Sequence, residues 1–101
     1  MSIGKSKPIE IADPFARRLM GKYIDKRNED IDRLTRALVD SDFETIRTTG
    51  HNLSGSGAAY GLDDISTLGA SIERAAIARD GPRIQRLIGE MTAFLKELTI
   101  C

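Results

Sequence analysis

A single histidine, His51, stands among the 101 residues, and imidazole is the side chain with the widest choice of chemistry near neutral pH. A metal-binding histidine on a helix usually has a second histidine or a carboxylate three or four residues away. The residues at those spacings are Arg47, Thr48, Ser54 and Gly55, and none of them is such a ligand. The spacing therefore argues against a metal site, and we expect none.

Nucleophilic hydrolysis is a second possibility, because Ser54 and Ser56 follow the histidine closely. A hydrolytic serine needs a base, a third group that orients the base, and a pocket for the substrate. No acidic residue lies one turn from His51 along the chain, and a small bundle offers little cavity. The remaining functional hypothesis is that the imidazole itself takes up and releases a chemical group. The alternative is that His51 is a surface histidine with no special role.

The helix that carries His51 is predicted from apolar and glycine positions that recur every three or four residues. These positions are Phe43, Ile46, Gly50, Leu53, Gly57 and Tyr60. His51 lies roughly 140° from the centre of this buried stripe, so it is expected to face solvent. Its own face holds Arg47, Ser54, Gly55 and Ala58. Close helix packing accounts for the stripe glycines, but Gly55 lies off the stripe, and access to the imidazole is the simplest reason for it.

Two helices are predicted ahead of the histidine helix. A short first helix begins at Asp13-Pro14, where aspartate can cap and proline suits the first turn. It ends near residue 20, because Gly21 favours a bend or break. A second helix covers residues 22–39. The run Ser41-Asp42-Phe43-Glu44 fits a capping box with Glu44 at the third helical position, and it starts the histidine helix.

Two more helices complete the predicted fold. Gly61 is expected to end the histidine helix, the next helix covers residues 63–78, and a last one runs from about Pro82 to Leu98. No strand pattern is present. The expected fold is all-α: an antiparallel up-down four-helix bundle with an additional short N-terminal helix across one end. Residues 1–12 are expected to be a flexible lead-in, and residues 13–99 the bundle domain.

Charge and composition restrict the partners and the location. The 15 basic and 15 acidic residues cancel, so neither nucleic acid nor a membrane surface is an expected partner. No apolar run is long enough to cross a membrane, and the residues before Ile9 lack the apolar core of a signal peptide. The single cysteine, Cys101, can form no internal disulfide, which favours the reducing cytoplasm. The start at Met1 favours a free-standing protein.

The run from Gly50 to Gly61 reads Gly-His-Asn-Leu-Ser-Gly-Ser-Gly-Ala-Ala-Tyr-Gly. It resembles the signature of the histidine-containing phosphotransfer (HPt) domains of bacterial multistep phosphorelays, His-x-Leu-Lys-Gly-Ser-(Ser/Gly) followed by a later glycine. A further family pattern, Leu-(Gly/x)-x-x-(Leu/Ile)-Glu-x-Ala, is similar to Leu-Gly-Ala-Ser-Ile-Glu-Arg-Ala-Ala at residues 68–76. The likeness covers roughly residues 13–98.

The resemblance implies that His51 accepts a phosphoryl group from the aspartyl phosphate of a receiver domain and passes it to another aspartate. The implied partner is a response-regulator receiver or a hybrid sensor histidine kinase, and the receiver supplies Mg²⁺. The chain itself would bind no cofactor, have no kinase activity of its own and act as a monomer. Gly55 matches the family glycine that leaves room for the phosphoryl group, with Arg47, Ser54 and Ala58 around it.

One position departs from the family pattern, because Ser54 stands where the family usually has lysine. A hydroxyl carries no charge, and charge-assisted hydrogen bonds are about twice as strong as neutral ones. Arg47 is not an obvious substitute, since its side chain leans away from His51. Three explanations stay open: less efficient transfer, a basic group from another helix, or a non-catalytic adaptor that docks receiver or kinase domains without relaying phosphate.

Overall fold

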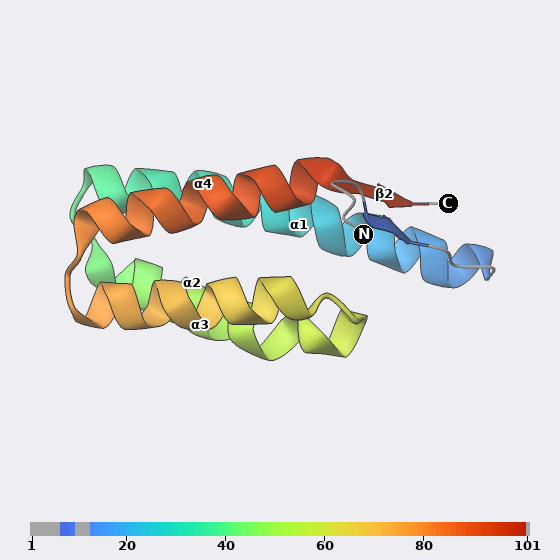
Figure 1. The fold of residues 1–101 in the computed structure, drawn as a ribbon, viewed down its shortest axis with the longest axis horizontal. Coiled ribbons are helices and arrows are strands. Elements are labelled where there is room, and N and C mark those ends of the chain that lie inside the picture. Colours follow the sequence, from blue (N-terminus) through green and yellow to red (C-terminus); the bar gives the residue numbers. More distant parts are fainter. Residues whose placement is uncertain (1–6, 10–12, 101) are drawn as a thin grey trace.

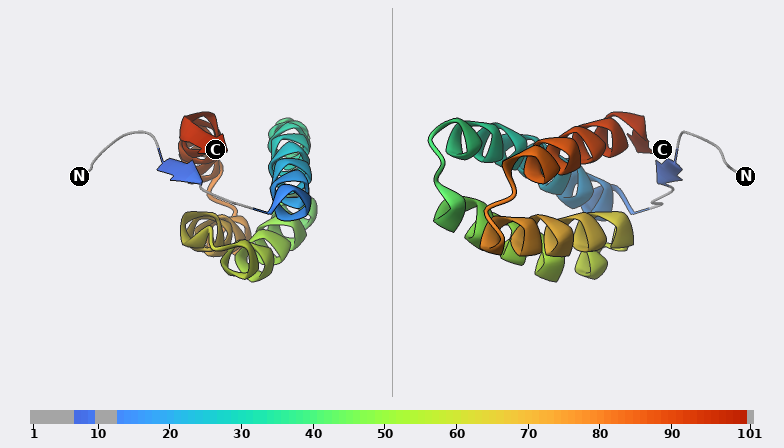
Figure 2. Two further views of the ribbon diagram at one scale, coloured as in Figure 1. Left: turned by 90° about the vertical axis from the view of Figure 1, so that its right-hand side faces the viewer. Right: turned by 60° about the vertical axis from the view of Figure 1, so that its left-hand side comes forward.

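Four helices form an up-down bundle in the computed structural model, which describes residues 7–9 and 13–100 (Figure 1). They are α1 (Pro14–Val39), α2 (Phe43–Ser56), α3 (Asp63–Ile77) and α4 (Gly81–Glu97). Short turns make consecutive helices antiparallel, and an end-on view places the four at the corners of the bundle (Figure 2). The predicted four-helix bundle is confirmed.

The additional short N-terminal helix does not exist as a separate element, because α1 is one continuous helix of 26 residues that passes through Gly21. Asp13 caps it as predicted, and its carboxylate accepts a hydrogen bond from the backbone N–H of Phe15 at 3.0 Å. On either side of the glycine, Met20 and Tyr23 are buried. Their packing outweighs the helix cost of one glycine, which is about 1 kcal/mol.

Two short strands, which the sequence patterns did not predict, lie where the ends of the described chain meet. They are β1 (Lys7–Ile9) and β2 (Leu98–Ile100), and they pair in parallel. Strands of three residues are too short to show an alternating pattern. Of the expected flexible lead-in, residues 1–6 and 10–12 lie outside the described residues, and residues 7–9 form β1.

Asp42, and not Ser41, caps the helix that carries the histidine. Its carboxylate accepts hydrogen bonds from the hydroxyl of Thr45 at 2.6 Å and from the backbone N–H of Thr45 at 3.1 Å. These two bonds, the hydroxyl bond first, hold the pKa of Asp42 below its usual value. Ser41 takes a left-handed turn conformation with φ 55°. Glu44 therefore has no capping-box partner and instead pairs with Arg47.

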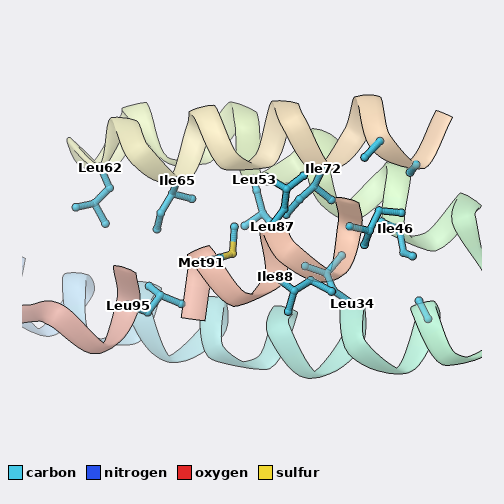
Figure 3. Packing of buried hydrophobic residues seen from close by; sticks show 14 of the residues in the cluster. Leu34, Ile46, Leu53, Leu62, Ile65, Ile72, Leu87, Ile88, Met91 and Leu95 are labelled. Atoms are coloured by element: carbon cyan, nitrogen blue, oxygen red, sulfur yellow. The ribbon is translucent and has the colours of Figure 1, made fainter. Parts of the chain in front are cut away.

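The core lies between the α1–α4 pair and the α2–α3 pair, and it is aliphatic (Figure 3). Its fully buried large side chains are Leu34, Ile46, Leu53, Ile65, Ile72, Ile84 and Met91. Helices α2 and α3 approach most closely. A Cβ at Gly50 would lie 2.7 Å from the backbone nitrogen of Glu73, and one at Gly69 would lie 2.6 Å from that of Ser54. The close packing predicted for the stripe glycines is confirmed.

The α-helical part of the histidine helix ends at Ser56, earlier than the predicted Tyr60, and a 3₁₀ turn, η1 (Ala58–Tyr60), follows. The backbone N–H of Ala58 donates to the Ser66 hydroxyl at 2.8 Å instead of to its own helix. Gly61, with φ 75°, ends the turn. Tyr60 is not buried in the stripe: the residue is 41% exposed, and its ring stacks on that of Tyr23 of α1.

Candidate functional site

His51 lies in the second half of α2, and its side chain is 70% exposed. Ile46 and Leu53 on the opposite face of the helix are almost completely buried, which fixes the rotation of α2 about its axis. The histidine therefore faces solvent, as the apolar stripe predicts. Because the helix is anchored along its buried face, the point from which the imidazole projects is fixed.

A carboxylate from the neighbouring helix holds the imidazole. Nδ1 of His51 lies 3.2 Å from Oε2 and 3.4 Å from Oε1 of Glu73 on α3. An ionised carboxylate only accepts hydrogen bonds, so in the neutral form of the imidazole the proton is on Nδ1 and the lone pair is on Nε2. Nε2 is on the opposite edge of the ring from the carboxylate. The site thus presents an oriented nitrogen nucleophile to solvent.

Glu73 belongs to the candidate site, but the sequence patterns placed it only inside the family pattern at residues 68–76 and gave it no role. It is 22 positions from His51, so no spacing rule along one helix connects them. The close approach of α2 and α3 brings them together, because the backbone of Glu73 lies against Gly50, the residue before the histidine. The pair of glycines on facing stripes, Gly50 and Gly69, is the sequence signal that could have predicted this contact, because it sets the register of α2 against α3.

The C-terminal flank of the histidine is open. A Cβ at Gly55 would meet no atom within 4 Å, so the missing side chain leaves real free space there. Ala58, in η1, is exposed and small. The hydroxyl of Ser54 turns back and donates to the backbone carbonyl of His51 at 2.7 Å. None of these three residues covers the imidazole.

The Hpt domain family model matches residues 18–98, most of the chain. The chain belongs to the Hpt domain family. Hpt domains carry out histidine phosphotransfer in the phosphorelays of two-component signalling, where they interact with receiver domains and kinases. Comparisons with curated proteins and with solved structures gave no match.

Around the histidine of this Hpt domain, Arg47 is the basic residue on the same helix face, one turn earlier. Its Nε donates to Oε1 of Glu44 at 3.3 Å, and its Nη2 donates to Oε2. These hydrogen bonds, and then the charge of Glu44, raise the pKa of Arg47, and the charge of Glu73 adds a smaller contribution. Arg47 is thus within electrostatic reach of the His51–Glu73 pair while bound elsewhere.

The basic residues of α1 that face α2 are engaged in a second network. Arg27 donates to Asp30 at 2.8 Å, and Arg33 donates to the other oxygen of the same carboxylate. The Arg27 guanidinium lies 4.3 Å from the ring centroid of Tyr23, whose hydroxyl lies 2.9 Å from that of Ser56. This network ties the end of α2 to α1, and so it fixes the helix just beyond the open flank.

Neither a metal-ligand cluster nor a membrane-spanning helix is found among the described residues. Within residues 7–9 and 13–100, no group of three or more histidine, cysteine, aspartate or glutamate side chains could hold a metal ion. Across the same part of the chain, each helix is too short or too polar to span a membrane.

Proposed function

We propose that this Hpt domain relays phosphate through Nε2 of His51, which accepts a phosphoryl group from the aspartyl phosphate of a receiver domain and passes it to another aspartate. The observation that supports this most is the contact of Nδ1 with Glu73, at 3.2 Å, together with a ring that is 70% exposed. The exposed nitrogen is then the one with the lone pair, and a receiver can approach it directly.

The bonds and charges of the transfer balance without a co-reactant. The Nε2 lone pair forms a bond to phosphorus, the bond between phosphorus and the aspartate oxygen breaks, and that electron pair leaves with the aspartate. The Nδ1 proton stays in place, so the ring becomes a positively charged imidazolium. The carboxylate of Glu73 lies against that charge and stabilises it. The reverse sequence returns the phosphoryl group to a second aspartate.

Positioning is the main contribution of the Hpt domain in this scheme. Phosphoryl transfer needs in-line placement of the attacking and leaving atoms and neutralisation of charge on the phosphoryl oxygens. The open flank at Gly55 and Ala58 leaves room for both the phosphoryl group and the partner's surface. Mg²⁺ would come with the receiver. One copy of the chain holds every proposed site residue, so we expect a monomer that meets its receiver or hybrid kinase in the cytoplasm.

The direct test is phosphotransfer from a receiver domain charged with acetyl phosphate in the presence of Mg²⁺. We expect acid-labile, base-stable label on the wild-type Hpt domain and none on His51→Gln. A thermal melt of both proteins checks that the substitution leaves the bundle folded. Equal labelling of the two proteins would show that His51 is not the acceptor.

Replacing Glu73 by glutamine tests how the imidazole is activated. The amide oxygen of Glu73→Gln still accepts from Nδ1 but carries no charge, and we expect transfer about fivefold slower, since neutral hydrogen bonds are about half as strong. Glu90→Gln on α4 removes the same charge elsewhere and serves as the control. A normal rate in Glu73→Gln would show that Glu73 contributes by orienting the imidazole and not by its charge.

A second candidate function is a non-catalytic adaptor that docks receiver or kinase domains. It is favoured by Ser54, whose hydroxyl is turned to the backbone and brings no charge to the site. Titration with a receiver separates the two functions. Binding that is unchanged by His51→Ala, with no transfer by the wild type, would favour the adaptor.

A further inference from the structure

A phosphoryl group on His51 would create a charge problem within the site. It carries about −1.5 to −2 charges near neutral pH. The carboxylate of Glu73 already lies 3.2 Å from the other nitrogen of the same ring. The positive imidazolium offsets only one of these charges, and like charges at such distances repel unless a cation is close. Ser54 brings no charge, so a cation supplied by this chain has to come from another residue.

Arg47 is the cation that the fold places on the face of His51. Four residues along a helix correspond to about 40° of rotation and about 6 Å of rise, so the two side chains are neighbours on one face. A helical side chain leans toward the preceding turn, which takes the imidazole of His51 toward Arg47 even though Arg47 itself leans away. The arginines of α1 that could compete, Arg27 and Arg33, are both bound to Asp30.

We propose that Arg47 binds the phosphoryl group of phosphorylated His51, and that Glu44 holds Arg47 until that group arrives. The inference rests on the relay function proposed above. Two nitrogens of the guanidinium, Nε and Nη2, already donate side by side to the two oxygens of Glu44. The same two N–H groups match two oxygens of a phosphoryl group. When Arg47 leaves Glu44 for the phosphoryl group, it exchanges one pair of acceptor oxygens for a pair of higher charge.

The exchange of partners is favourable because the existing pair is weak. The side chains of Arg47 and Glu44 are 40% and 74% exposed, and exposed ion pairs contribute little to stability. Both carboxylates lie within reach of the charge of Arg47: Glu44 is the main cause that raises the pKa of Arg47, and the charge of Glu73 adds a smaller contribution. After the exchange, the positive charge of Arg47 adjoins the phosphoryl group and offsets part of its repulsion with Glu73.

The experiment measures how label distributes at equilibrium between the charged receiver and the Hpt domain. This distribution reports the stability of the phosphorylated histidine relative to aspartyl phosphate, and a purely structural role of Arg47 would not move it in a folded protein. We expect Arg47→Gln to shift the equilibrium toward the receiver about tenfold, the usual worth of a charge-assisted hydrogen bond. Arg47→Lys should retain part of the effect, because it keeps the charge but not the paired N–H groups.

Three further variants complete the design. Glu44→Gln removes the competing carboxylate and should shift the equilibrium toward the Hpt domain. Arg86→Gln on α4 removes the same charge far from the site and should change nothing. Ser54→Lys, added to Arg47→Gln, should restore part of the lost stability, because it returns a positive charge to the flank of His51. Thermal melts of all variants check that the bundle is intact.

The outcomes separate this inference from the relay function. If the wild type takes label and His51→Gln does not, an equilibrium in Arg47→Gln equal to that of the wild type overturns the role of Arg47 and leaves the relay in place. No label on the wild type overturns both. An unchanged or lowered share of label in Glu44→Gln would show that Glu44 does not compete for Arg47.

Discussion

The two halves of the bundle are built by different kinds of contact. All four helices contribute large side chains to the core, among them Leu34 of α1 and Met91 of α4. Helices α2 and α3 also meet backbone to backbone through glycines such as Gly50 and Gly69, whereas a Cβ at Gly21 of α1 or at Gly89 of α4 would meet nothing within 4 Å. Side chains can partly relax into a space left by a substitution, but a backbone contact has no such freedom. The candidate site joins α2 to α3, so it sits on the half whose geometry is least adjustable.

The largest expected effect on stability comes from a substitution in the α1–α4 pair. Met91→Ala on α4 removes a fully buried side chain and should lower the free energy of unfolding by about 2–5 kcal/mol. We expect phosphotransfer per folded molecule to stay near that of the wild type, since α4 does not carry the site. Urea unfolding and the labelling assay at low temperature measure the two quantities, with Met91→Leu as a control of conserved volume. Loss of transfer in the folded fraction would mean that the two halves are coupled.

Gly69→Ala tests the other half with a single methyl group. The new Cβ would lie 2.6 Å from the backbone nitrogen of Ser54, so α3 must move away from α2. Such overpacking should cost about 1–3 kcal/mol of unfolding free energy. It should also slow transfer, because it draws Glu73 away from His51. A destabilised variant with full transfer would show that the site does not depend on this contact.

Alanine substitutions at two exposed glycines, Gly55 and Gly89, separate an effect on stability from an effect on phosphotransfer. A Cβ at Gly55 or at Gly89 would meet nothing within 4 Å, and alanine favours helix by up to about 1 kcal/mol over glycine. Both Gly55→Ala and Gly89→Ala should therefore stabilise the protein in thermal unfolding. Only Gly55→Ala should slow transfer, because its methyl group enters the open flank of His51. Equal transfer by both variants would remove the functional reason for Gly55.

The smallest change in the fold is expected for Ser54→Lys. The serine hydroxyl bonds only to a carbonyl of its own helix, so stability should change by less than about 0.5 kcal/mol. The added ammonium lies on the site flank, and we expect faster phosphorylation or a longer phosphohistidine lifetime. No change in either quantity would show that the serine is no handicap to this Hpt domain.

The fold was predictable wherever the apolar pattern and the burial agree. The positions Ile46, Gly50 and Leu53 predicted both the existence of α2 and the face that carries His51. The pattern was wrong at Gly21, where local propensity favoured a break and the packing of neighbouring buried residues kept α1 continuous. Propensity is a weak signal whenever burial on both sides opposes it.

The site was predictable only to the extent that it lies on one helix. His51, Arg47 and Gly55 share a face that the spacing along α2 reveals. Glu73 comes from α3, and Glu44 holds Arg47 only because Asp42, one residue later than predicted, caps the helix. Contacts between helices, and the choice between two adjacent caps, depend on the assembled bundle and not on a period in the sequence.

The stacked rings of Tyr23 and Tyr60 give this molecule a natural optical probe. The chain has two tyrosines and no tryptophan, and the two ring centroids lie 4.0 Å apart at the junction of α1 and η1. The intrinsic tyrosine fluorescence therefore arises from one place, and Tyr60 belongs to the same 3₁₀ turn as Ala58 of the open flank. We expect a receiver that binds at that flank to change the emission of the unlabelled protein, which would report docking separately from phosphate transfer.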